Sequence, residues 1–488
     1  MKHAYQDSVA LVQLDGKSRQ PLHRQVYASM RQAMLDGRLK AGDKIASSRR
    51  LATILGISRI PIVVAYDQLF AEGYIETKRG SGTYVAASIP DVSFGAVRNG
   101  QPSDKAKPST AATSEAHNWR PSDLLKPFRV SLPALQEFPH EHWSRLVSKH
   151  ARRQSIHAMA YGDPMGHKPL RQEIAQYLTA VRGLRCDWNQ VLIVTGSQQA
   201  LQLCASVLLK PGDSVWMEDP GYPGARDALL RAHAKITPVP VDEEGLQVSI
   251  GKTKCPSAAL CYVTPSHQYP LGMTLSASRR MELLEWAHTK RRWVIEDDYD
   301  SEFRYTGQPI ASLQSLAPDR VIYIGTFSKV MFPALRVGYV VLPTSLVESF
   351  RAARDASDIF SATLYQSVLA EFIRDGRFSS HLRRMRAIYM TRRADLIELL
   401  KPFESYGCRI LSAPAGLHLV LDLPPGWRDS AIVELAAKEG VIAAPVSECC
   451  LKSKKNGLIL GYGGTTKEQM RPAAATLLDM CRSHSDPQ

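Results

Sequence analysis

Apolar residues recur at steps of three and four between residues 21 and 73, which predicts three helices. The first helix runs from Pro21 to Gly37. Its apolar face consists of Leu22, Val26, Met30, Ala33 and Met34. The second starts near Ser47 or Ser48 and ends at Gly56, and the third extends from Ser58 to Gly73. Two short helices joined by a turn that contains glycine are typical of a helix-turn-helix.

Two short strand-like runs follow the third helix, at 74–77 and 83–85. The turn between them, 78–82, is basic and rich in glycine, so we predict a wing. Residues 1–86 contain 13 Lys and Arg against 7 Asp and Glu. Basic charge on this arrangement of helices favours a DNA-binding surface over a face that is merely solvated.

Residues 87–127 are rich in Pro, Ser, Ala, Gly, Asn and Asp and show little apolar periodicity, which is the composition of a linker. Beyond them, apolar strand-like runs alternate with amphipathic segments of helix length. The runs are 191–194, 214–217, 259–263, 293–295 and 321–324. This alternation predicts an α/β domain with a mostly parallel sheet.

The composition of the 488 residues is that of a folded multidomain protein, with 44% hydrophobic and 22% charged residues. The net charge of +14 indicates an anionic partner such as nucleic acid. We expect a cytoplasmic protein without a membrane partner, because no apolar run resembles a signal peptide or is long enough to span a bilayer. The eight cysteines lack CxxC spacing, so we expect free thiols rather than disulfides or a metal site.

Several turns that follow predicted strands carry residues suited to chemistry. Lys329 and Arg336 follow one strand, and acidic residues at 296–298 follow another, at the edge where α/β sheets bind ligands. A helix opens at Ser197 directly after a third strand, and its free amides suit a phosphate. Each feature alone is ordinary turn chemistry, but together they indicate one site.

This constellation resembles the fold-type I aminotransferases, which use pyridoxal 5′-phosphate, over residues 128–482. The resemblance implies that Lys329 is the catalytic lysine and forms the internal aldimine, and that Asp297 pairs with the pyridine nitrogen. It also implies that Tyr299 hydrogen-bonds the 3′-oxygen of the ring and that Tyr222 stacks on the ring. The implied phosphate ligands are Ser197, Gln198, Thr326, Ser328 and Arg336, with Tyr161 reaching across a dimer interface.

Residues 8–86 resemble the winged helix-turn-helix of the GntR family. The motifs that carry this resemblance are PLHRQ (21–25), SSRRLA (47–52), LGISR (55–59), AY (65–66), EG (72–73) and GSGT (80–83). Recognition helices contact base edges through their N-terminal residues, and basic wing residues add phosphate contacts. The residues that we expect at DNA are Arg49, Ser58, Arg59, Lys78, Arg79, Gly80 and Gly82.

A GntR-type module joined by a long linker to an aminotransferase-like domain is the architecture of the MocR-type (GabR-like) regulators. The runs TPSHQ (264–268), EDDYDSEFR (296–304) and AGLH (415–418) are similar to that subfamily rather than to metabolic aminotransferases. We therefore expect a DNA-binding domain at 8–86, a flexible linker at 87–127, and a pyridoxal-phosphate-binding domain at 128–482. The last of these would combine a large, mostly parallel sheet with a small C-terminal α+β subdomain.

Two positions depart from the pattern that the resemblance implies. Pro61 stands in the first turn of the recognition helix, where the family commonly has threonine, so one polar group that could touch DNA is missing. Ile459 stands in a C-terminal strand where aminotransferases usually carry an arginine that binds the substrate carboxylate. An isoleucine cannot bind a carboxylate.

These features favour a transcriptional regulator that senses an amine, an amino acid or pyridoxal phosphate itself, and is not an enzyme, over two alternatives. One alternative is a working aminotransferase with an accessory DNA-binding domain. The other is a nucleic-acid protein with an empty second domain, which the retained Lys329, Asp297, Tyr299 and Arg336 argue against. We expect a homodimer on double-stranded DNA with paired half-sites, and the long linker permits the DNA modules to swap onto the partner.

Overall fold

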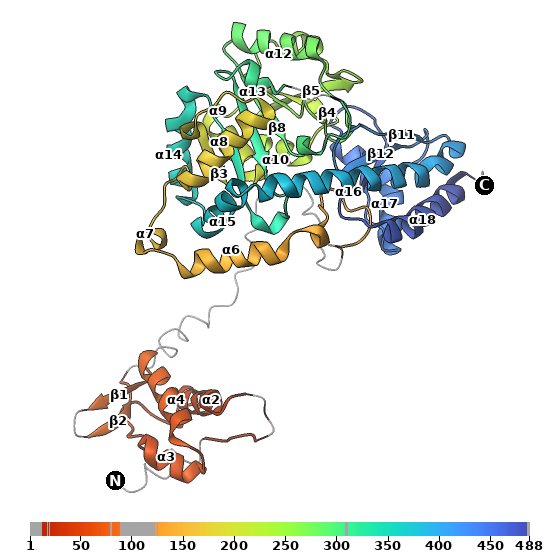
Figure 1. Ribbon diagram of the computed structural model, residues 1–488. Coiled ribbons are helices and arrows are strands. Elements are labelled where there is room, and N and C mark those ends of the chain that lie inside the picture. Colours follow the sequence, from red (N-terminus) through yellow and green to blue (C-terminus); the bar gives the residue numbers. More distant parts are fainter. Residues whose placement is uncertain are drawn as a thin grey trace. The chain divides into compact units, whose positions relative to one another are not determined.

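The computed structural model folds into two compact units, Met1–Thr113 and Ser114–Gln488 (Figure 1). It describes residues 12–16, 18, 20–78, 81–87, 123, 125–307 and 311–485. Arg79 and Gly80 of the predicted wing, and most of the predicted linker 87–127, lie outside these residues.

The N-terminal unit contains three helices and a two-stranded sheet, as the sequence predicts. Its elements are α2 (Leu22–Leu35), α3 (Ser48–Leu55), α4 (Arg59–Ala71), β1 (Ile75–Lys78) and β2 (Gly82–Val85). The strands pair antiparallel and place Ile75 opposite Val85. The hydroxyl of Ser47 accepts a hydrogen bond from the Arg50 amide at 3.3 Å and caps α3. Gly56, with a φ of 65°, ends α3 in the left-handed conformation that favours glycine.

Helix α4 packs on the core of this unit through a buried stripe of Ile62, Ala65, Tyr66 and Leu69. The Tyr66 hydroxyl donates a hydrogen bond to the Ala46 carbonyl at 2.8 Å. Ser58 stands at the N-cap of α4, but its side chain makes no capping hydrogen bond. Ser58 thus occupies the N-cap position at which the sequence places the start of this helix, and its residue is exposed.

The second unit is built on an eight-stranded mixed sheet with the order β3-β10-β9-β8-β7-β4-β5-β6. The strands are β3 (Val191–Val194), β4 (Ser214–Asp219), β5 (Lys235–Asp242), β6 (Gly245–Leu246), β7 (Leu260–Val263), β8 (Trp293–Asp298), β9 (Val321–Thr326) and β10 (Gly338–Val341). The five strands from β9 to β5 run parallel, whereas β10 is antiparallel to both of its neighbours. The predicted, mostly parallel sheet is thus confirmed.

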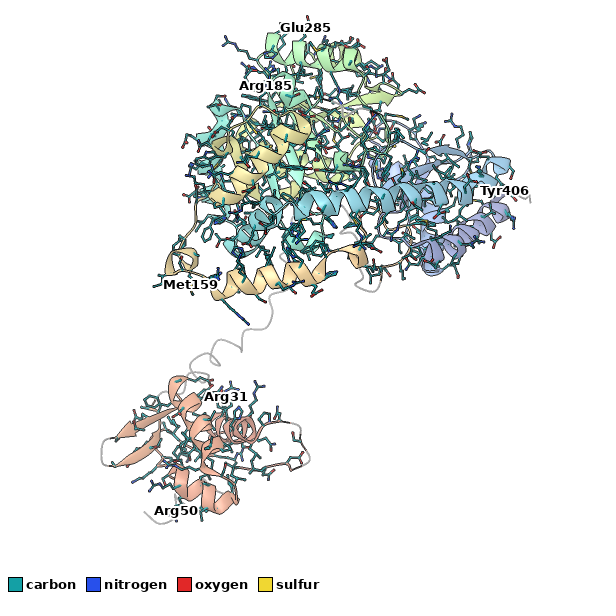
Figure 2. All side chains as sticks on the ribbon, viewed as in Figure 1. Arg31, Arg50, Met159, Arg185, Glu285 and Tyr406 are labelled. Atoms are coloured by element: carbon teal, nitrogen blue, oxygen red, sulfur yellow. The ribbon has the colours of Figure 1, made fainter. Side chains whose placement is uncertain are left out.

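Helices cover both faces of this sheet, so its strands are buried on both sides. Along β3, Val191 and Ile193 join one apolar core and Leu192 and Val194 join another, because alternate side chains of a strand point to opposite faces. Figure 2 shows the side chains that fill the space between the elements. The helices up to the small sheet are α6 (His140–Arg152), α7 (Ile156–Met159), α8 (Lys168–Arg182), α9 (Ser197–Leu208), α10 (Pro223–Arg231), α11 (Val248–Lys254), α12 (Ala277–Thr289), α13 (Leu313–Leu316), α14 (Val347–Asp358), α15 (Thr363–Arg374) and α16 (Arg377–Leu400).

A small antiparallel sheet with the order β11-β12-β14-β13 forms the predicted C-terminal subdomain. Its elements are β11 (Arg409–Leu411), β12 (His418–Asp422), α17 (Asp429–Lys438), β13 (Ala444–Pro445), β14 (Gly457–Gly461) and α18 (Lys467–Ser485). Helix α16 extends from the large sheet to this subdomain (Figure 1). Short 3-10 turns complete the unit at 135–137, 188–190, 301–303, 333–335, 344–346, 401–406 and 447–449.

Asp219, the last residue of β4, joins the large sheet to the subdomain. Its carboxylate accepts hydrogen bonds from the amides of Leu451, Lys452 and Ser453 and from the Ser453 hydroxyl, each at 2.8 Å. The end of a strand in the large sheet is thereby fixed to a loop of the small subdomain.

Among the helices that the structure describes, none has the length and apolar character needed to cross a membrane.

A buried ion pair between Arg182 and Asp298 is predicted to stabilise the larger unit. Arg182 donates to Asp298 at 2.7 Å, and the Tyr323 hydroxyl donates to the same carboxylate at 2.6 Å. We expect Arg182→Met to lower the free energy of unfolding by about 3–5 kcal/mol, because it leaves a buried carboxylate without its cation. Urea unfolding followed by tryptophan fluorescence measures this unit, since all seven tryptophans follow residue 118.

The matched control is Arg145→Met, which removes an exposed pair with Glu141. This control should cost no more than about 1 kcal/mol. Equal losses in the two variants would contradict a stabilising role for the buried pair.

Candidate functional site

A pocket lies beside the carboxyl ends of β7, β8 and β9, three neighbouring parallel strands. The pocket and its mouth hold about 400 Å³ of empty space. The residues that line it are Ser131, Ser197, Tyr222, Tyr262, Thr264, Tyr269, Asp297, Tyr299 and Lys329. Five of the sequence-predicted site residues therefore meet here: Ser197, Tyr222, Asp297, Tyr299 and Lys329.

Asp297 is buried in the floor of this pocket, near the end of β8. The Tyr262 hydroxyl donates a hydrogen bond to its Oδ2 at 2.8 Å, whereas Oδ1 has no hydrogen-bond partner among the described residues. Burial raises the pKa of the Asp297 carboxyl to about 7, against the opposing effect of the Tyr262 hydrogen bond. An unpaired carboxylate oxygen in a pocket is the partner that a protonated pyridine nitrogen requires.

Lys329 comes shortly after the end of β9, which is the strand next to β8 in the sheet. It is one of the residues that line the pocket. Its Nζ donates a hydrogen bond to the Ser131 carbonyl at 3.2 Å. Burial lowers the pKa of the Lys329 amine to about 8, although the charges of Asp300 and Asp297 oppose this effect. A substantial fraction of the amine is therefore neutral near pH 8, as a lysine nucleophile must be.

The predicted phosphate ligands gather around the start of α9. Ser197 and Gln198 form its first turn, and Gln198 Nε2 donates to the Gly224 carbonyl at 3.0 Å. Gly196, with a φ of 131°, precedes the helix, and a Cβ there would lie 3.5 Å from Arg336 Nη1. The Arg336 guanidinium has no hydrogen bond or ion pair with the described residues. A helix N-terminus with an uncommitted guanidinium beside it is a suitable cradle for a phosphate.

The remaining two predicted phosphate ligands lie at the end of β9. Thr326 is buried and its hydroxyl accepts a hydrogen bond from the Ser328 amide at 3.2 Å. Ser328 is half-buried and directly precedes Lys329. Neither residue lines the pocket itself.

Aromatic rings enclose the pocket. The ring of Tyr222 contacts that of Tyr269 edge to face, with centroids 5.5 Å apart. Tyr299 donates from its hydroxyl to the His267 carbonyl at 2.9 Å. A flat heteroaromatic ligand between such walls would be held by stacking and edge contacts.

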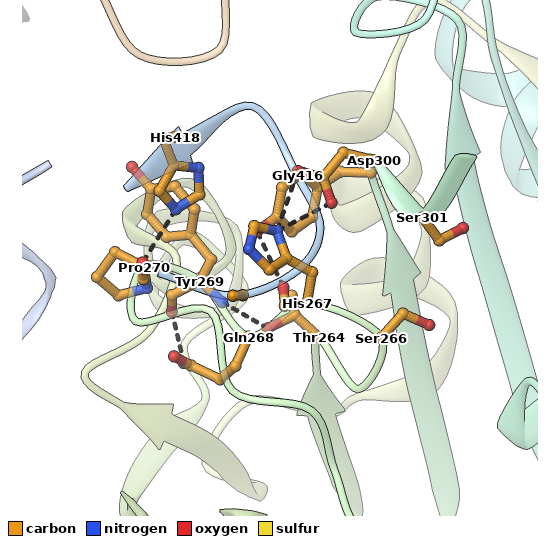
Figure 3. A network of polar contacts seen from close by, with 12 residues as sticks. Thr264, Ser266, His267, Gln268, Tyr269, Pro270, Asp300, Ser301, Gly416 and His418 are labelled. Atoms are coloured by element: carbon orange, nitrogen blue, oxygen red, sulfur yellow. Dashed lines mark hydrogen bonds and ion pairs between the residues drawn. The ribbon is translucent and has the colours of Figure 1, made fainter. Parts of the chain in front are cut away.

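A buried polar network adjoins Tyr299 through His267, and Figure 3 shows it around His267, Asp300 and His418. His267 Nδ1 lies 3.0 Å from Asp300 Oδ2, and His418 Nε2 lies 2.9 Å from the Pro270 carbonyl. Burial lowers the pKa of His418 to about 3, so this ring is neutral. Imidazoles and carboxylates also ligate transition metals, and donor atoms of His267, Asp300 and His418 lie within 4.8 Å of one another. Here the hydrogen bonds account for the cluster, because Asp300 orients His267 and Pro270 orients His418.

Four pocket residues were not among the predicted site residues: Ser131, Tyr262, Thr264 and Tyr269. Tyr262 lies on β7 and Thr264 follows it, beside β8 in the sheet. Thr264 is the first residue of the TPSHQ run (264–268), and Tyr269 directly follows this run, so the run could have pointed to both residues. Nothing local in the sequence marks Ser131, which comes from the segment before α6.

Neither Tyr161 nor Ile459 is among the residues that line the pocket. Tyr161 is 83% exposed, and its ring contacts Phe360 with centroids 6.1 Å apart. Ile459 is buried on β14 in an apolar cluster with Val420 and Val446, against which Tyr269 packs. None of the nine lining residues is an arginine.

The predicted DNA contacts lie on the N-terminal unit. Arg49 and Arg59 are exposed in the first turns of α3 and α4, and Arg59 Nε donates to the Ser48 hydroxyl at 3.1 Å. On the strands, Lys78 Nζ lies 3.3 Å from Glu76 and 5.1 Å from the centroid of the Tyr84 ring. Gly82 opens β2 with a φ of 116°.

Comparisons with known proteins agree with both units. A family model described as "Bacterial regulatory proteins, gntR family" matches residues 22–85, and one described as "Aminotransferase class I and II" matches residues 135–477. In solved structures, the kynurenine aminotransferase of Pyrococcus horikoshii is similar with a TM-score of 0.69 and 28% identity. This similarity covers 74% of this chain and 91% of that chain.

Relatives with both units are also found. A "Probable rhizopine catabolism regulatory protein MocR" of Rhizobium meliloti is 37% identical over 470 residues, which cover 95% of this chain and 94% of the relative. An "HTH-type pyridoxine biosynthesis transcriptional regulator PdxR" of Corynebacterium glutamicum is 31% identical over 457 residues, which cover 93% and 95%. With a GntR-type winged helix-turn-helix, an aminotransferase fold and relatives that match nearly its whole length, the chain belongs to the MocR-type regulators of the GntR family, whose cofactor is pyridoxal 5′-phosphate.

Proposed function

We propose that this regulator senses an amine, an amino acid or pyridoxal 5′-phosphate itself in the Lys329 pocket, and alters its binding to DNA without turning its ligand over as an enzyme. One observation carries the proposal. Lys329 and an unpaired oxygen of Asp297 face the same pocket, but none of the residues that line it is an arginine. The pocket is therefore equipped to hold the cofactor and poorly equipped to bind a substrate carboxylate.

The residues of this chain fit the cofactor one group at a time. Asp297 Oδ1 would accept from the pyridine nitrogen, Tyr222 would pack on the ring, and Tyr299 would turn its hydroxyl toward the 3′-oxygen. When bound, pyridoxal phosphate supplies an electron sink and a carbonyl group that amines attack. Lys329 supplies the amine, and its buried site favours the neutral form.

The phosphate would be held by backbone amides, side-chain hydroxyls and one guanidinium. We assign this role to the first turn of α9 with Ser197 and Gln198, to the hydroxyls of Thr326 and Ser328, and to Arg336. Support comes from the guanidinium of Arg336, which has no hydrogen bond or ion pair with the described residues and whose Nη1 lies 3.5 Å from where a Cβ of Gly196 would stand. Anions bind at such sites through oriented N–H groups.

A sensor is favoured over an aminotransferase by the surroundings of Ile459. Turnover of an amino acid requires its carboxylate to be held so that the reacting bond is aligned, and a misplaced substrate reacts orders of magnitude more slowly. A carboxylate beside the cluster of Ile459, Val420 and Val446 would be desolvated without a partner. Lys329 and Asp297 are also the residues that an aminotransferase would need, so they fit the alternative of an enzyme with an accessory DNA-binding domain equally well. A measurement of turnover distinguishes the two.

We further propose that the protein is a cytoplasmic homodimer. Tyr161 can reach a phosphate only if it comes from a neighbouring subunit, since it lies outside the pocket and is 83% exposed. Ile156 and Met159, in the adjoining helix α7, are also strongly exposed, and apolar side chains of this kind are often covered in a dimer. Two DNA modules in one particle would bind paired half-sites.

We assign a separate function to each of three segments of the chain. Residues 8–86 would bind DNA, 87–127 would link the two units, and 128–482 would bind the cofactor. In the first segment we assign base contacts to Arg49, Ser58 and Arg59. Backbone contacts from the wing are assigned to Lys78, Arg79, Gly80 and Gly82, of which Arg79 and Gly80 lie outside the described residues.

The amine of Lys329 gives a prediction with a pH signature. In cofactor-free protein, the rate at which pyridoxal phosphate attaches to Lys329 should rise with pH and level off above about pH 8, because the lowered pKa makes the amine neutral there. Stopped-flow absorbance measures this rate. With Nα-acetyl-lysine in solution, the matched control, the rate should keep rising to about pH 10.

Lys329→Ala should abolish attachment at every pH. A rate that keeps rising to pH 10 in the wild type would contradict the lowered pKa, and attachment in the variant would contradict the assignment of Lys329.

Turnover separates the sensor from the enzyme. We expect the wild type, mixed with amino acids or amines and a keto-acid acceptor, to form product well below about 1 per second, because none of the nine residues that line the pocket is an arginine that could bind the carboxylate. Coupled assays of keto-acid formation measure this rate, with Lys329→Ala as the blank. Rates of 1 per second or more would make the aminotransferase alternative the correct one.

Arg59 tests the DNA interface. Arg59→Ala should weaken binding by tenfold or more to a duplex selected by the protein from a random pool, because it removes a charged donor at the start of the recognition helix. Fluorescence anisotropy at physiological salt measures the dissociation constant. Arg38→Ala, which removes an exposed arginine paired with Asp36, is the control and should bind as the wild type does. Equal affinity of all three proteins would refute the assignment.

A further inference from the structure

Helix α4 presents hydrocarbon where a recognition helix usually presents polar groups. Ile60, its second residue, is 74% exposed, and Val64, one turn further on, is 42% exposed. Because residues four apart lie on the same side of a helix, these two side chains form one stripe. The stripe lies away from the face that Ile62 and Leu69 bury in the core.

A single exposed aliphatic side chain is ordinary on a protein surface, so the position of Ile60 decides its meaning. Ile60 lies in the first turn of the second helix of the helix-turn-helix, whose N-terminal residues enter the major groove in proteins of this architecture. Its chain neighbour Arg59 and the nearby Arg49 are exposed and basic, which matches the charge of DNA. Asp67, the one acidic residue of α4, lies two turns away.

The surroundings limit what the first turn can offer to a base. Arg59 is held by its Nε hydrogen bond to Ser48, which leaves its Nη groups without partners among the described residues. Pro61 has neither an amide N–H nor a polar side chain. Apart from Arg59, the first turn of α4 therefore offers aliphatic groups.

In the major groove, an aliphatic side chain has one complementary feature. Thymine alone among the four bases carries a methyl group there, at C5, whereas the other base edges present donors and acceptors that a hydrocarbon would leave unpaired. We propose that Ile60, with Val64 beside it, contacts thymine methyl groups and makes each half-site require thymine next to the base pair that Arg59 contacts. This inference rests on the DNA-binding part of the proposed function.

Deoxyuridine provides the test, because it differs from thymidine only by the methyl group. Full-length protein with its cofactor first selects duplexes from a random pool. Each thymine of the selected half-site is then replaced by deoxyuridine, one at a time, and the dissociation constant is measured by anisotropy. For the wild type we expect at least one replacement to weaken binding by about three- to tenfold, the loss that one buried methyl group accounts for.

The variant Ile60→Ala should bind the thymine and deoxyuridine duplexes equally at that position. Ile60→Thr keeps one methyl on the branched carbon, so it should retain part of the difference and guards against a folding defect in the alanine variant. Phe70→Ala is the matched control, since Phe70 is also exposed, at 54%, but lies ten residues further along α4, about 15 Å away. The Phe70→Ala variant should distinguish thymine from deoxyuridine duplexes as the wild type does.

The outcomes separate this inference from the function on which it rests. Selection of a duplex in which no thymine methyl affects binding would overturn the inference and leave DNA binding intact. Undiminished discrimination in Ile60→Ala would also overturn it. If no sequence is enriched at all, the DNA-binding proposal and this inference fall together.

Discussion

Burying the carboxylate of Asp297 costs free energy, and hydrogen bonding within the protein offsets only part of this cost. Tyr262 satisfies one oxygen, and the other faces the pocket without a partner. Lys329 beside it is subject to the same burial, which favours its uncharged form. Two groups that would each prefer water are thus held in a buried pocket, where a partner that binds either group would offset part of this cost.

The parallel sheet makes this arrangement possible. Strands β7, β8 and β9 are neighbours and run in the same direction, so the residues that end them share one edge. Each strand brings a different function to that edge: Tyr262 from β7, the acid from β8 and the amine after β9. The polar residues of β8 stand at its carboxyl end, after the apolar Val294 and Ile295, so helices can cover both faces of the sheet.

The sequence predicts those parts of the site that follow a strand directly. Asp297, Lys329 and Ser197 could be placed because a buried run stops and chemistry begins within a few residues. Tyr262 and Ser131 could not, because their positions depend on which strand lies beside β8 and on where a distant segment crosses the pocket. The fold of each unit was predictable from periodicity, whereas the antiparallel direction of β10 depends on long-range pairing that periodicity does not report.

The bonds of Asp219 to the loop 451–453 have a consequence for movement. Tyr222, which walls the pocket, comes three residues after Asp219, and the loop belongs to the small subdomain. To separate the subdomain from β4, the molecule must break four hydrogen bonds to one carboxylate, each worth about 1.5–3 kcal/mol. The strand end acts as a latch, and a ligand opens it only by binding the open form more tightly by at least that amount. The loop 451–453 and the strand end that leads to Tyr222 are thus held to each other, so a displacement of one displaces the other unless these bonds break.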